Sequence, residues 1–117
     1  MTRYALDTNI ISYILRKDET VRSRFRNESA QGNEFVMIPV VYYEVSRWLK
    51  ERGAMKLQES FDDLCSRLPL LITGKDIWDK ASDLYVYTRK IGKPVGSDAD
   101  LLIASYCLLN NCTLVTT

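Results

Sequence analysis

Apolar residues along the chain fall into two kinds of segment, and the two kinds alternate. Short apolar-rich runs predict strands, and they cover residues 3–7, 35–38, 70–73 and 113–116. Longer segments with apolar residues at helical spacing predict helices, at about residues 10–15, 19–31, 39–52, 55–68, 76–91 and 98–109. Strands that alternate with helices indicate an α/β domain with a parallel sheet covered on both faces.

Residue types at the helix ends support these boundaries. Gly53 ends the helix that begins at Pro39, and Gly32 ends the helix before it. Ser97 is suited to cap the last helix, and Asp100 follows three residues later in the capping-box position. Because the chain shows no repeat, linker or low-complexity segment, we expect residues 1–117 to form a single domain.

The composition excludes several classes of protein. With 46% hydrophobic and 26% charged residues the chain is of ordinary globular type, and no apolar run approaches the roughly 20 residues of a membrane span. No basic and apolar leader follows Met1, so we expect a cytoplasmic protein without a membrane partner. The three cysteines Cys65, Cys107 and Cys112 are odd in number and far apart, which favours structural thiols.

The absence of histidine constrains the chemistry most. It removes imidazole acid–base catalysis, histidine-activated nucleophiles and histidine-ligated zinc together. Any hydrolysis would therefore use carboxylates and a metal ion. The formal net charge of +1 is also too small for nonspecific attraction of nucleic acid by a global field, so any such binding must be local.

Four acidic residues are placed by this pattern near the carboxyl ends of the predicted strands, where sites form in open α/β sheets. Asp7 ends the first strand, Glu44 lies in the first turns after the second, and Asp98 and Asp100 open the last helix. Carboxylate oxygens are the ligands that hard cations such as Mg²⁺ take. The pattern therefore predicts a metal site built from these acids.

Each acid also has a simpler interpretation. Asp7 could cap the helix that follows it. Asp98 and Asp100 could stabilise the last helix by interacting with the positive end of its dipole. Glu44 lies at the border of the apolar stripe of its helix, which predicts partial burial, although a surface contact with Arg47 remains open. Convergence favours the metal site, because two carboxylates ~4 Å apart repel by about 4 kcal/mol at an effective dielectric near 20. A cation would remove this repulsion, polarise a phosphodiester oxygen and activate water.

Four motifs hold these acids or follow them: LDTN around Asp7, IPVVYYEV around Glu44, GKPVGSDADLLIA around Asp98 and Asp100, and LVTT at residues 114–117. In this order they resemble the motifs of a PIN domain, and more narrowly those of the VapC-type toxins of bacterial toxin–antitoxin pairs. Each motif alone is weak, but the ordered set is specific and spans the whole chain.

The resemblance implies a three-layer sandwich in which a parallel sheet of four to five strands is flanked by helices on both faces. It implies that Asp7, Glu44 and Asp100 bind the metal, that Asp98 joins them as a less regular neighbour, and that Asn9 and Thr116 support the site. It further implies Mg²⁺ or Mn²⁺ as cofactor, RNA as substrate (often tRNA or a ribosomal RNA loop), a small antitoxin as partner, and a homodimer.

In that family a further segment, which usually adds an Asn or Asp and a last strand, follows the position of Thr116. This sequence stops at Thr117, so we expect either that it is truncated or that this segment is absent, which affects the fourth ligand of the family pattern and the activity of this chain. The leading hypothesis is a metal-dependent endoribonuclease toxin. The alternatives are a catalytically silent PIN module that binds RNA or a protein, and a carboxylate–metal phosphatase acting on small phosphoesters.

Basic and aromatic residues offer weaker indications of substrate binding. Arg16 and Arg47 are candidates for a basic rim around the acids, although a solvated helix face explains them equally, since acidic residues are interspersed. Tyr42, Tyr43, Tyr85, Tyr87 and Trp48 could stack on bases, but their helical spacing predicts that most of them lie in the core or at a dimer interface.

Overall fold

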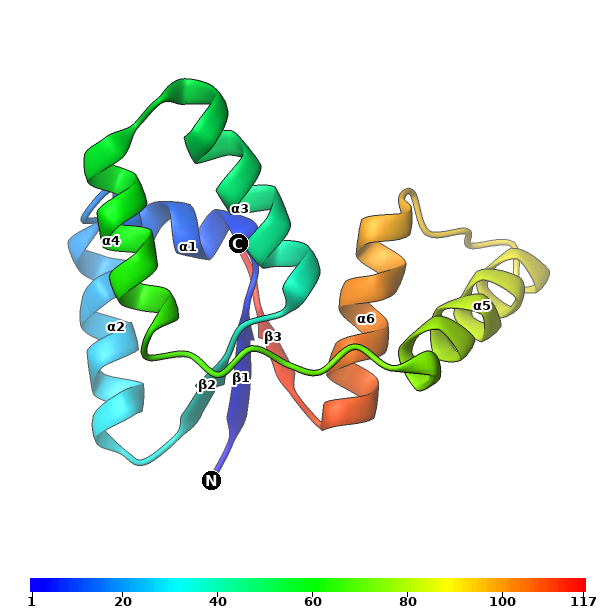
Figure 1. Ribbon diagram of the computed structural model, residues 1–117. Helices are drawn as coiled ribbons and strands as arrows, with labels where there is room; N and C mark the ends of the chain where they lie inside the picture. The colour runs from blue at the N-terminus through cyan, green and yellow to red at the C-terminus, as the bar shows by residue number, and fades with distance from the viewer.

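Three short parallel strands form the centre of the computed structural model, which describes residues 1–117 (Figure 1). They are β1 (Arg3–Leu6), β2 (Glu34–Val36) and β3 (Thr113–Val115), arranged in the order β2-β1-β3. Tyr4 pairs with Phe35 on one side and with Thr113 on the other. The central strand is therefore the first in sequence, and its carboxyl end leads directly into the first helix.

Six helices flank this sheet, as the sequence pattern predicts. They are α1 (Thr8–Leu15), α2 (Glu19–Ala30), α3 (Pro39–Arg52), α4 (Met55–Cys65), α5 (Lys75–Lys90) and α6 (Asp98–Asn110). Ser97 caps α6 as expected, since its side chain accepts a hydrogen bond from the N–H of Asp100. None of the helices combines the length and apolar character that a membrane crossing requires.

The segment 70–73, predicted as a strand, takes only a small part in the sheet. Leu70 forms one parallel bridge with Met37, where the N–H of Met37 donates to the carbonyl of Pro69 and the N–H of Leu71 donates to that of Met37. Pairing stops there because α3 begins at Pro39, which leaves the rest of the segment without a neighbouring strand. The sheet therefore has three strands and one bridging segment.

The core lies between the sheet and the helices that pack on it. β1 contributes Ala5 and Leu6, and α3 contributes an apolar stripe that includes Val41, Val45 and Leu49. α6 is apolar on more than one side, as expected of a helix between two layers. Its residues Ile103 and Tyr106 join the core, whereas Leu101 is buried outside it, on the side of the helix opposite to them.

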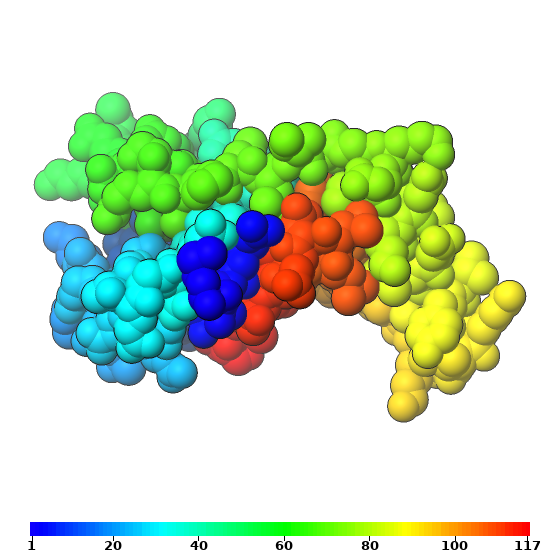
Figure 2. Space-filling model, turned by 90° about the horizontal axis from the view of Figure 1, so that it is seen from below, coloured from blue at the N-terminus to red at the C-terminus, as the bar shows by residue number.

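α5 stands apart from the rest of the molecule (Figures 1 and 2). It packs mainly against α6, and Ile77 is its only buried residue. Several large apolar side chains on this pair of helices are exposed, namely Trp78, Tyr85, Val86, Tyr87, Leu108 and Leu109. α5 and the outward face of α6 on which it packs therefore form a projecting arm, while the other face of α6 belongs to the core.

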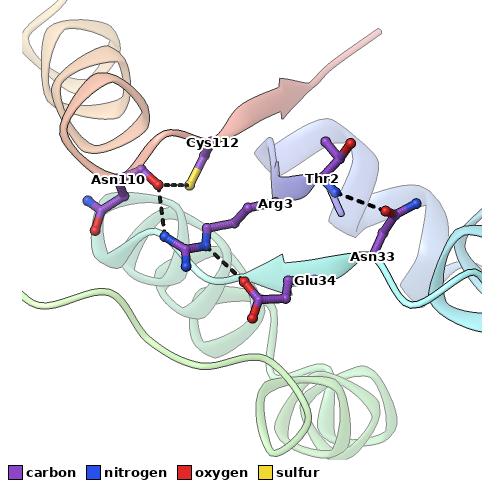
Figure 3. Close-up of polar contacts among 6 residues, drawn as sticks. All are labelled: Thr2, Arg3, Asn33, Glu34, Asn110 and Cys112. Carbon is purple, nitrogen blue, oxygen red and sulfur yellow. Dashed lines mark hydrogen bonds and ion pairs between the residues drawn. The ribbon is translucent and has the colours of Figure 1, made fainter.

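Polar contacts fasten the amino ends of the strands (Figure 3). The guanidinium of Arg3 donates to the carboxylate of Glu34 on β2 (Nε to Oε2, 2.9 Å) and to the carbonyl of Asn110 before β3 (2.9 Å). The N–H of Thr2 donates to Oδ1 of Asn33 (3.0 Å). Arg3 thus links β1 to β2 and to the end of α6 at the amino end of the sheet, and the acids of interest lie at the opposite, carboxyl end.

Candidate active site

Asp7 is fixed at the carboxyl end of β1 by contacts to both of its carboxylate oxygens. Oδ1 accepts a hydrogen bond from the N–H of Thr8 (2.7 Å), and Oδ2 accepts one from the hydroxyl of Thr116 just after β3 (2.9 Å). Asp7 is also the N-cap of α1, as the simpler interpretation predicts. Capping and a chemical role are compatible, because the half-buried carboxylate still lies at the edge where a site is expected.

Glu44 comes to the same place from α3. It is half-buried, as its position on the helix predicts, and its Oε1 accepts a hydrogen bond from the hydroxyl of Thr8 (3.2 Å). Thr8 thus contacts both acids, Asp7 through its backbone and Glu44 through its side chain. The sequence interpretation did not select Thr8, although a hydroxyl directly after an acid that caps a helix is a signal that could have identified it.

Asp98 and Asp100 do not join this pair. Both are exposed in the first turn of α6, and neither carboxylate makes a hydrogen bond or an ion pair. No three acidic or cysteine side chains lie close enough together to hold a metal ion. The structure thus brings together Asp7 and Glu44, while the ligand roles of Asp98 and Asp100 stay predictions.

The oxygen donors of this edge match the chemistry of a hard cation only in part. Asp7 and Glu44 offer carboxylate oxygens and no sulfur or nitrogen, which suits Mg²⁺ or Mn²⁺. Two carboxylates are fewer than the ligands such a cation takes, so the remaining positions would fall to water or to the acids of α6. In the arrangement seen, the ion site is incomplete.

The predicted supporting residues differ in their surroundings. Thr116 donates to Asp7, whereas Asn9 is exposed and its side chain makes no hydrogen bond. Arg16 lies over the ring of Tyr13 (5.2 Å from its Cζ to the ring centroid), and Arg47 lies over that of Tyr43 (5.1 Å). Both arginines are exposed and neither forms an ion pair with an acid of the chain.

The tyrosines of α3 and α5 are predicted to lie mostly in the core or at a dimer interface; the single chain does not bury them in its core, and their place at an interface stays a prediction. Tyr42, Tyr43, Tyr85 and Tyr87 are between 41% and 59% exposed, whereas Trp48 packs against the core. The partly exposed ring of Tyr42 still stacks on the core residue Phe61 (5.5 Å between ring centroids). Helical spacing misleads here because these rings lie on the flanks of the apolar stripes, where a phenol can keep its hydroxyl in water.

A thiol lies near the acids. Burial raises the pKa of Cys107 to about 11, with smaller contributions from Cys112 and from the charge of Asp7. This thiol is therefore protonated at neutral pH and is a weak nucleophile.

Comparison with known proteins identifies the family. Residues 4–117 match the family model of the PIN domain, and the chain therefore belongs to the PIN domain family. A significant match to a curated protein was not found.

Solved structures show the same fold. One is VapBC2 of Rickettsia felis bound to a DNA fragment from their promoter (26% identity, TM-score 0.85), with 98% of this chain and 86% of that chain covered. Another is VapBC-1 of nontypeable Haemophilus influenzae (24% identity, TM-score 0.75), with the same coverage. A third is DNA-bound VapBC of Salmonella typhimurium (20% identity, TM-score 0.81, 99% and 86% covered).

Proposed function

We propose that the protein is a VapC-type toxin, a divalent-metal-dependent endoribonuclease that hydrolyses phosphodiester bonds of tRNA or ribosomal RNA. The observation that carries this proposal is the joining of Asp7 and Glu44 through Thr8 at the carboxyl edge of a PIN fold. A pair of carboxylates held together in this way is a starting point for binding a cation, because each would otherwise repel the other.

Mg²⁺ or Mn²⁺ is the proposed cofactor, held by Asp7 and Glu44 with Asp98 and Asp100 as further ligands. When bound, such an ion would polarise a phosphodiester oxygen and lower the pKa of a water molecule toward neutrality. The residues of the chain have simpler tasks. Thr116 and Thr8 keep the two carboxylates in place, and Arg47 offers a positive charge to an approaching phosphate.

The similar solved structures suggest the partners of this protein. The structures described above are VapBC complexes, and a complex from Klebsiella pneumoniae is described as toxin–antitoxin. We therefore expect a small antitoxin to neutralise this protein in the cytoplasm, and we expect a homodimer in which the exposed apolar side chains of the α5–α6 arm are covered. Production of the chain alone should arrest bacterial growth, and co-production of the antitoxin should restore it.

The decisive experiment compares two aspartates that have the same structural role. Asp7 caps α1 and Asp18 caps α2 through its side chain, and asparagine caps helices as well as aspartate. With Mn²⁺ or Mg²⁺ and tRNA, Asp7→Asn should lower the cleavage rate more than about a hundredfold, whereas Asp18→Asn should leave it unchanged. Cleavage by the parent protein in excess chelator, or full activity of Asp7→Asn, would refute the proposal.

One observation favours an alternative, a PIN module that binds RNA or a protein without cutting RNA. It is the position of Asp98 and Asp100, which do not complete an acidic cluster with Asp7 and Glu44. Under this alternative the parent protein would bind RNA and cleave none with any divalent ion. Asp7→Asn would then bind RNA at least as tightly as the parent, since it only removes a negative charge.

A further inference from the structure

An exposed aromatic ring and an arginine lie beside Glu44 on α3. Tyr43 directly precedes Glu44 and is 59% exposed, and Arg47 lies one turn further along the same helix. The guanidinium of Arg47 is 5.1 Å from the centre of the Tyr43 ring, within the range of a cation–π contact. The two side chains therefore form a flat, positively charged surface at the border of the acidic pair.

Neither side chain has an evident task in the fold. Tyr43 is absent from the residues that pack against the core, and its hydroxyl makes no hydrogen bond within the chain. Arg47 forms no ion pair and donates no hydrogen bond to another residue. The ring face and the positive charge are both free to meet a ligand.

Three similar pairs are less well placed. Arg16 lies over the half-buried ring of Tyr13, but the eight residues of α1 lie between Asp7 and Arg16, which places them about 13.5 Å apart along the axis. Arg47 is three residues from Glu44, only about 4.5 Å along α3. The remaining pairs lie over Trp48, which packs against the core, and over Tyr85, which belongs to the projecting α5.

We infer that Tyr43 and Arg47 form a platform for an unpaired base of single-stranded RNA, with the ring stacking on the base and the guanidinium contacting the adjacent phosphate. This inference rests on the proposed function and adds the form of the substrate to it. Bases that are splayed out of a helix present their faces to aromatic and arginine side chains, whereas bases within a duplex are already stacked on one another. The platform therefore selects loops and single strands.

The first test measures binding without cleavage. A fluorescein-labelled single-stranded RNA of about twelve nucleotides is titrated with protein in the presence of chelator, and anisotropy gives Kd. Tyr43→Ala should weaken binding about five- to a hundredfold, and Tyr43→Phe should stay within about twofold because the ring remains. Tyr87→Ala is the control for loss of an exposed ring, since Tyr87 on α5 is equally exposed (59%) and has no arginine over it. Because Tyr87 lies on the arm proposed to dimerise, all variants are compared at a protein concentration where sedimentation shows the same oligomeric state. On a duplex of the same sequence, Tyr43→Ala should bind like the parent.

Salt dependence separates the roles of the two side chains. Arg47→Ala should reduce the slope of log K against log salt by about 0.7, the value for one phosphate contact to a single strand. Tyr43→Ala should leave that slope unchanged, because stacking releases no counterion. A fluorescent aminopurine in the RNA should be quenched by the parent protein and by Tyr43→Phe, but not by Tyr43→Ala.

Several results would overturn the platform. Equal affinities of Tyr43→Ala and Tyr87→Ala for single-stranded RNA would refute it. If the parent protein still cleaves tRNA in that case, the proposed ribonuclease function stands without the platform. Loss of affinity in Tyr43→Ala that follows a change from dimer to monomer, seen by sedimentation, would mean that the ring contacts a second protein chain. Failure of the parent protein both to bind and to cleave RNA would remove the platform together with the proposed function.

Discussion

At the scale of single residues, Thr8 is the most informative finding. Its N–H donates to Asp7 and its hydroxyl donates to Glu44, so one residue links the two acids. Side chains that orient ligating groups without touching the ion typically affect metal affinity or activity by 10–100-fold. In the proposed chemistry the hydroxyl of Thr8 belongs to this class, because it orients Glu44.

We therefore expect Thr8→Val, which keeps the shape and removes the hydroxyl, to lower the rate of tRNA cleavage about ten- to a hundredfold. Thr8→Ser should stay close to the parent because it keeps the donor. Single-turnover rates at saturating Mn²⁺ measure the effect. Thr113→Val is the control, since Thr113 is exposed on β3 and its side chain makes no hydrogen bond. Full activity of Thr8→Val would show that the contact with Glu44 is incidental.

Cys107 provides a pH dependence that can be measured without substrate. Its pKa is raised from 9.0 to about 11 in the folded protein, chiefly by burial. As the pH rises above about 9, the unfolded chain loses this proton while the folded chain keeps it, so unfolding becomes more favourable. The stabilisation is therefore complete below pH 9 and is lost between about pH 9 and 11.

The parent protein should thus lose more stability over this pH range than Cys107→Ala does. Denaturant unfolding at pH 8, where the thiol is neutral in both states, gives the baseline for each protein. Parallel curves of unfolding free energy against pH for the two proteins would contradict the assignment of this loss to Cys107.

At the scale of helices and strands, helix ends decide much of the structure. The residues just after five of the helices have positive φ: Lys17, Gly32, Gly53, Gly92 and Asn111. The N–H of the residue after each donates to a carbonyl five residues earlier, as from Cys112 to Cys107. Glycine adopts this conformation freely, but Lys17 at φ 62° does so at a cost.

Lys17→Gly should therefore stabilise the protein, by up to about 1 kcal/mol, because relief of the strained backbone exceeds the added entropy of the unfolded chain. Lys50→Gly, at an exposed position inside α3, should instead destabilise it by about 1 kcal/mol. Urea denaturation of both variants tests these opposite signs. A loss of stability in Lys17→Gly would mean that the lysine side chain itself stabilises the end of α1.

The same local signals explain which elements are predictable from the sequence. Gly53 and Ser97 mark helix ends through chemistry that acts within a few residues, so those boundaries follow from the sequence alone. Whether residues 70–73 pair as a strand depends on how far the neighbouring segment, residues 34–37, stays extended. That is a property of another part of the chain. The approach of Glu44 to Thr8 could be anticipated, because both follow neighbouring parallel strands. The separation of Asp98 and Asp100 from Asp7 and Glu44 depends on how α6 packs on the rest of the molecule. The local sequence pattern does not predict that packing.

At the scale of the whole molecule, the projecting arm departs most from a compact domain. The radius of gyration is 15.0 Å, whereas a compact chain of this length has about 13 Å. α5 packs mainly on α6, and helices in proteins gain most of their stability from such packing of an apolar face. The arm also carries Asp98 and Asp100, so its position determines how far these acids lie from Asp7.

Hydrogen exchange measured by mass spectrometry tests both the stability of the arm and the proposed homodimer. At low protein concentration the amides of α5 should exchange faster than those of α3, because α3 lies in the core and few apolar contacts hold α5. Over an increase of about a hundredfold in concentration, protection of α5 should rise if a second copy covers Trp78 and Tyr85, since association stabilises what it buries. α3 serves as the internal control, and its protection should stay constant. Protection of α5 as strong as that of α3 at every concentration would show that the arm is already rigid in the single chain, and that its exposed side chains need no partner to hold it.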